Sequence, residues 1–139
     1  MNTKNSYQRI LEIFLWLVAL HSFLVGITLM VTPASVFIYF GYAPINEKFF
    51  PVQGGVFHIV LSIAYLMAAR DVIGQGRMVM LTISAKIVAT VFLFTYYFLI
   101  AQIWIVLVSG LVDGIMGITV WYLYSRLLRS TSRPKGADN

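Results

Sequence analysis

Long apolar stretches separated by short polar segments dominate the pattern of this sequence. Four stretches are close to the roughly 20 residues that a helix needs to cross a bilayer, namely 10–31, 52–69, 78–100 and 103–124. They lack the strict alternation of a barrel strand, and hydrocarbon offers no water to backbone groups, so we expect helices. Because the connections are short, neighbouring helices should run antiparallel. The sequence therefore predicts an all-α fold, an integral membrane four-helix bundle that forms one domain over residues 1–129.

The longest connection, residues 32–51, is unusually rich in aromatic and apolar side chains. Pro33 suits a helix start, while Gly41 and Pro44 suit a helix end, so a short helix over 34–40 is predicted to lie in the membrane interface. One interpretation of this connection is an aromatic belt that anchors the loop. The other is a lid over a pocket that opens toward the outer side.

Composition excludes a soluble fold, because 60% of the 139 residues are hydrophobic and only 11% are charged. The net charge of +5 follows from basic residues at one side of the predicted helices. They are Lys4, Arg9, Arg70, Arg77, Arg126, Arg129, Arg133 and Lys135. This distribution predicts that both termini are cytoplasmic and makes a nucleic-acid partner unnecessary. The polar residues 130–139 are expected to form a disordered tail.

Each predicted helix carries one ionisable residue where the bilayer makes it costly: His21, His58, Lys86 and Asp113. Counting along the helices places all four in one central layer. The lysine stem is long enough to reach the level of the carboxylate, which predicts an ion pair between Lys86 and Asp113.

Helical spacing places these residues on faces of small or hydroxyl side chains. The second helix aligns His58 with Ser62 and Tyr65, whereas the first aligns His21 with Val25 and Thr28. In the fourth helix, Gly110 and Gly114 form a GxxxG that indicates close packing within the bundle or a dimer face. The candidate ligand-binding residues are therefore His21, His58, Ser62, Tyr65, Lys86 and Asp113.

Several kinds of chemistry are compatible with this layer. The lysine–aspartate pair alone can serve to fix helix register, and neutral imidazoles can be satisfied by hydroxyls such as those of Ser62 or Tyr65. Sharper alternatives are a b-type haem between His21 and His58, and a metal site that adds Asp113 to them, which Lys86 would oppose. The chain has no cysteine. It also contains no phosphate-binding loop or hydrolase motif.

A further pattern combines an aromatic loop after Pro33, the run Gln53-Gly54-Gly55-x-x-His58, and Ala68-Ala69-Arg70-Asp71, with Lys86 and Asp113 in the last two helices. In these features the chain resembles small bacterial four-helix membrane proteins of the DoxX-like kind, over about residues 10–125. The resemblance implies a compact bundle in the bacterial inner membrane, sometimes linked to redox or thiosulfate partners. The absence of cysteine puts any thiol-based mechanism in doubt, and no catalytic residue carries over.

The residues together favour a non-enzymatic membrane protein, either an accessory subunit of a larger complex or a module that binds a lipid or a quinone. The alternative is an intramembrane enzyme or proton-coupled carrier that uses Asp113, Lys86 and a histidine. The third interpretation is the haem carrier. Expected partners are membrane lipids and a larger membrane complex or a second copy of the chain, and the favoured interpretation requires no cofactor.

Overall fold

The computed structural model describes residues 6–131, and within them the chain is helical with no strand. Four long helices alternate with short connections, and a seven-residue 3₁₀ helix follows the first of them. They are α1 (Ser6–Val31), η1 (Ala34–Phe40), α2 (Phe49–Arg70), α3 (Gly76–Leu99) and α4 (Trp104–Thr131). The all-α four-helix bundle and the short helix between the first two spans are confirmed.

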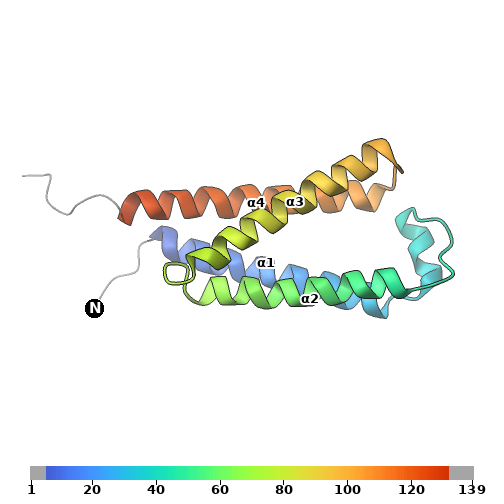
Figure 1. Cartoon of the computed structure of the whole chain (residues 1–139), viewed down its shortest axis with the longest axis horizontal. Coiled ribbons are helices and arrows are strands. Elements are labelled where there is room, and N and C mark those ends of the chain that lie inside the picture. Colours follow the sequence, from blue (N-terminus) through green and yellow to red (C-terminus); the bar gives the residue numbers. More distant parts are fainter. Residues whose placement is uncertain (1–5, 132–139) are drawn as a thin grey trace, which may run out of the picture.

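The helices form two antiparallel pairs, α1 with α2 and α3 with α4 (Figure 1). The pairs touch each other less extensively, through α1 with α4 and α2 with α3. The start of α1, the α2–α3 connection and the end of α4 lie together at what we call the termini end. The connection that contains η1 and the α3–α4 connection lie at the opposite loop end. All arginines of residues 6–131 belong to the termini end, as the charge pattern predicted.

The apolar core lies in the half of the bundle nearest the termini end. Most of its members come from the first half of α1, the last half of α2, the first half of α3 and the last half of α4, and Val72 comes from the α2–α3 connection. The best buried of them, at 0 to 1% exposure, are Leu11, Leu15, Val18, Tyr65, Ala68, Val72, Val79 and Val120. The second half of α3, residues 87–99, contributes no buried residue. The two helix pairs are therefore joined mainly through one half of the bundle.

The connection between α1 and α2 folds back onto the start of α4. Gly41 ends η1 with φ +92°, a left-handed conformation that glycine adopts without strain, and its N–H donates to the carbonyl of Ile38. A side chain at Gly41 would approach Trp104 at 3.2 Å. Phe40 packs on Trp104 with ring centroids 6.3 Å apart. This glycine therefore fixes both the end of η1 and its close contact with α4.

The helices are somewhat longer than the apolar stretches that predicted them, mainly because polar residues at the termini end continue α1 and α4. α1 begins four residues earlier, at Ser6, and α4 continues past Tyr124 to Thr131. Ser130 and Thr131, the first two residues of the predicted tail, are therefore helical. The rest of the predicted tail, residues 132–139, lies outside the described residues.

Large apolar side chains cover the outside of the long helices. All four are long and apolar enough to cross a membrane, with mean hydropathy between 1.6 and 2.2 over their best windows. Trp16 and Leu20 on α1, Phe57 on α2 and Ile118 on α4 are each about half exposed or more. Such a surface suits lipid and not water, so the chain is a multi-pass membrane protein.

Candidate functional site

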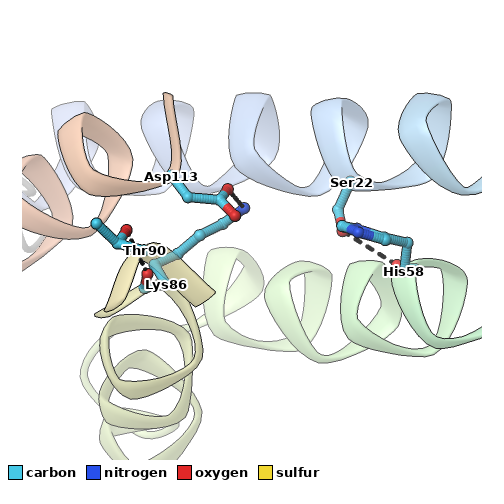
Figure 2. A network of polar contacts seen from close by, with 5 residues as sticks. All are labelled: Ser22, His58, Lys86, Thr90 and Asp113. Carbon is cyan, nitrogen blue, oxygen red and sulfur yellow. Dashed lines mark hydrogen bonds and ion pairs between the residues drawn. The ribbon is translucent and has the colours of Figure 1, made fainter. Parts of the chain in front are cut away.

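The predicted ion pair between α3 and α4 is present. Lys86 Nζ lies 2.5 Å from Asp113 Oδ1, and these residues are only 2% and 7% exposed (Figure 2). Gly117, one turn beyond Asp113, makes room for the lysine, because a Cβ there would lie 3.1 Å from Lys86 Cβ. Inside an apolar bundle, each charge is tolerated because the other neutralises it.

Tyr65 connects this ion pair to α2. The Lys86 ammonium lies 5.6 Å from the centroid of the Tyr65 ring, which is fully buried. A cation at this distance from an aromatic ring gains a favourable cation–π interaction. The Thr90 hydroxyl donates to the Lys86 carbonyl at 2.7 Å within α3. Tyr65 thus joins the predicted pair of Lys86 and Asp113, a contact that the sequence did not predict, and the three residues link α2, α3 and α4.

His58 forms a second polar contact, between α2 and α1, and its partner is Ser22 (Figure 2). The Ser22 hydroxyl donates to the His58 carbonyl at 3.1 Å and lies 3.2 Å from Nδ1 of the ring. This hydroxyl therefore lies within hydrogen-bond distance of both the backbone and the ring of His58. Figure 2 shows this contact nearer the loop end than the ion pair, so the predicted single layer consists of two separate contacts.

Two details of the sequence prediction are wrong. The Ser62 hydroxyl donates to the carbonyl of Ile59 in its own helix, at 2.7 Å, and does not serve a histidine. The inward face of α1 carries Ser22 and Gly26, whereas Thr28 is exposed. Ser22 and Gly26 face inward because α1 and α2 lie very close together, and only small residues permit such close packing of two helices. Gly26 lies against Gly55, where a Cβ would lie 2.8 Å from the Gly55 carbonyl oxygen.

The GxxxG of α4 packs within the bundle. A Cβ at Gly110 would lie 2.8 Å from the Phe94 ring, and one at Gly114 would lie 3.3 Å from the Thr90 side chain. Both neighbours belong to α3, so the glycines bring α3 and α4 together. Of the two predictions for this motif, close packing within the bundle is confirmed.

Replacing Ser22 with alanine should lower the stability of the bundle by roughly 0.5–1 kcal/mol, the usual worth of a hydrogen bond between membrane helices. The measurement is the free energy of unfolding in mixed detergent micelles. Ser62→Ala is the matched control, because that buried hydroxyl bonds only within its own helix. Equal losses for the two variants would show that the contact between Ser22 and His58 adds nothing to helix association.

His21 makes no hydrogen bond with these contacts, although it lies within electrostatic range of Lys86 and Asp113, and it lines a groove between α1 and α4 with a volume of about 310 Å³. We call it the α1–α4 groove. The rest of its lining is apolar and consists of Phe14, Leu17, Val18, Val112, Ile115 and Met116. His58 is not part of the lining. His21 is half-buried and has no hydrogen bond with any residue from 6 to 131. Its imidazole is therefore the single polar group presented to the contents of this groove.

A metal site is not supported by this arrangement. Within residues 6–131, no three histidine, aspartate or glutamate side chains lie close enough together to hold a metal ion. Asp113 is bound to Lys86, and His58 is turned toward Ser22. The alternative that joined His21, His58 and Asp113 around a metal therefore has no support from residues 6–131.

Comparison with known proteins identifies no relative. No protein-family model, curated protein or solved structure matches the chain. The class that the fold defines is a four-span helical membrane protein, and the resemblance to DoxX-like proteins stays a prediction.

Proposed function

We propose that the protein is a non-enzymatic membrane module that binds a lipophilic molecule with a polar head in the α1–α4 groove. The observation that carries this proposal is the imidazole of His21, which lines the groove without a hydrogen-bond partner among residues 6–131. In an apolar environment, a polar group without a hydrogen-bond partner is unfavourable by about 1–3 kcal/mol. A carbonyl or hydroxyl group of a bound lipid or quinone would supply the partner.

The shape and chemistry of the groove support an apolar ligand. Its volume of about 310 Å³ suits part of an acyl or isoprenoid chain, and its aliphatic and aromatic lining offers dispersion contacts to such a chain. The groove lies between α1 and α4, where the two helix pairs are in contact. A ligand there would contact both pairs and stabilise their association.

The buried ion pair supports a binding module over a catalyst. Lys86 and Asp113 neutralise each other, and Tyr65 covers the ammonium. Both charged residues are less than 10% exposed, so neither is open to a substrate. In this proposal they set the register of α3 and α4, and the groove with His21 provides the ligand site.

The experiment is a binding measurement on the purified protein in a mild detergent. Decylubiquinone quenches tryptophan fluorescence, so its titration reports occupancy, and mass spectrometry identifies lipids or quinones that co-purify. We expect His21→Leu to weaken decylubiquinone binding about tenfold, since one hydrogen bond of about 1.4 kcal/mol is lost. His21→Gln, which keeps an amide donor and acceptor, should retain most of the affinity.

The matched control is Thr28→Val, which removes an exposed polar group from the same helix outside the groove. It should leave binding unchanged. If His21→Leu binds decylubiquinone as tightly as the unchanged protein, and no lipid or quinone is retained through purification, the proposed groove ligand is wrong.

The proposal extends to the surroundings of the protein. The arginines at the termini end support an orientation with both termini in the cytoplasm of a bacterium, the chain lying in the inner membrane. The second half of α3, which has no buried residue, offers a face to another membrane helix. This supports a role as an accessory subunit or a homo-oligomer, for which native mass spectrometry of the detergent-extracted complex is the test.

A further inference from the structure

A second cavity lies at the loop end, away from the α1–α4 groove. It has a volume of about 370 Å³, within the usual range for small-molecule sites. Its walls come from the end of α1, from η1 with the loop that follows it, and from the start of α2. We call it the loop-end pocket, and the residues that matter below are Phe37, Tyr42, Glu47 and Phe50.

Aromatic rings form much of this pocket. Phe37 is buried and packs edge to face against Tyr42, with ring centroids 5.9 Å apart. Phe50 is 75% exposed and makes a similar contact with its neighbour Phe49 at 5.4 Å. Three aromatic side chains around one small cavity are the setting in which organic cations are recognised, because the ring faces carry negative potential.

The charge of the pocket comes from Glu47. The Phe49 N–H donates to Glu47 Oε1 at 2.7 Å, which holds the carboxylate at the start of α2. The neighbouring Lys48 forms no ion pair with it, because Lys48 Nζ donates to the Met30 carbonyl at 3.3 Å, at the end of α1. Among residues 6–131, Glu47 has no ion pair. The pocket therefore presents one negative charge without a counter-ion.

Tyr42 adds no second charge. Burial raises the pKa of its phenol above the ordinary value, and the nearby Tyr96 on α3 raises it further. The phenol is therefore neutral across the physiological pH range. Its hydroxyl is a hydrogen-bond donor, and its ring adds to the aromatic wall.

We propose that the loop-end pocket binds a quaternary ammonium group, with Glu47 as its counter-ion and Phe37, Tyr42 and Phe50 around its methyl groups. A metal cation does not fit, because a hard ion needs several oxygen ligands and this lining is mostly apolar. A bulky, weakly hydrated organic cation gains from both the rings and the single carboxylate. The ammonium group belongs either to a lipid headgroup or to a free solute.

The test uses choline and its uncharged carbon analogue 3,3-dimethylbutan-1-ol, which has the same shape. Binding to the full-length protein in detergent is followed by ligand-observed NMR. Choline should bind at least about tenfold more tightly than the neutral analogue, the size of a cation–π contact combined with an ion pair. Glu47→Gln should lower this preference, because the ion pair is lost and only the cation–π contacts remain, while its amide oxygen still accepts the hydrogen bond from Phe49 N–H.

Phe50→Leu provides a second variant that keeps the fold, because this side chain is largely exposed. It should weaken choline binding several-fold and leave the binding of the neutral analogue nearly unchanged. His21→Leu, in the other site, should have no effect on choline. Equal affinities for choline and its neutral analogue, or an unchanged preference in Glu47→Gln, would overturn the proposal.

Reconstitution in nanodiscs separates the two sources of the ammonium group. If choline binds more weakly in phosphatidylcholine nanodiscs than in phosphatidylglycerol nanodiscs, the lipid headgroup occupies the site. Equal choline affinity in the two nanodiscs, with the preference over the neutral analogue kept, identifies a free solute. Both results support the ammonium site, whereas loss of choline binding in both nanodiscs contradicts it.

Discussion

Replacing Lys86 with methionine should lower the free energy of unfolding by about 3–5 kcal/mol, the usual loss when one partner of a buried ion pair is removed. Methionine keeps most of the length of the lysine side chain but carries no charge. The Asp113 carboxylate, on a residue that is only 7% exposed, then lacks its cation. The measurement is unfolding in mixed detergent micelles, followed by the loss of helical circular dichroism.

The double variant Lys86→Met with Asp113→Leu tests the reason for this loss. Because the double variant has neither charge, it should recover most of the free energy of unfolding that the single variant loses. This result would show that the bundle can fold without the ion pair. Arg77→Met, which removes an exposed charge at the start of the same helix, is the matched control and should change stability by less than about 0.5 kcal/mol. A double variant no more stable than the single one would contradict this account.

Gly55→Ala should have the second largest effect, a loss of about 2 kcal/mol. A Cβ at Gly55 would lie 2.6 Å from the Gly26 carbonyl oxygen and 2.6 Å from Met30 Cγ. The first of these neighbours is backbone, so α1 and α2 must separate to admit the methyl group. The same unfolding measurement detects the loss, and the contact between Ser22 and His58 should weaken with it.

The adjacent glycine gives the matched control for this prediction. A Cβ at Gly54 would meet only Leu29 Cδ1, at an ordinary 3.8 Å. Gly54→Ala should therefore be neutral or slightly stabilising, because alanine restricts the unfolded chain more than glycine does. If the two alanine variants behave alike, close approach of α1 and α2 at Gly55 does not limit the stability of the bundle.

Hydropathy predicted the fold well because a membrane span must be long, apolar and helical. It located the spans of α1, α2, α3 and α4 within four residues at each end, except that α4 continues seven residues further, to Thr131. The cost of an isolated charge in hydrocarbon similarly predicted that Lys86 pairs with Asp113, since each is the other's available counter-charge. Pro33 precedes η1 and Gly41 follows it, and proline favours a helix start while glycine favours a helix end, so this short helix was also predictable.

Side-chain partners of neutral groups were harder to predict. The rotation of α1 about its axis decides whether His21 or Ser22 faces α2, and neighbouring residues differ by about 100° on a helix. Apolar side chains surround α1 on all sides, so no polar face identifies that rotation. Ser22 was therefore missed. The sequence signal for this rotation is the pair of small residues Ser22 and Gly26 on one face of α1, and in the structure Gly26 lies against Gly55.

The pairing of the helices has a consequence for biosynthesis. Ser22 and His58 both belong to the α1–α2 pair, and Lys86 and Asp113, 27 residues apart, both belong to the α3–α4 pair. In each helical hairpin, the polar side chain of one helix therefore has its partner on the other helix of the same hairpin. If the hairpins enter the bilayer one after the other as units, the lysine reaches hydrocarbon together with its aspartate. The insertion machinery then never has to place an uncompensated charge in lipid.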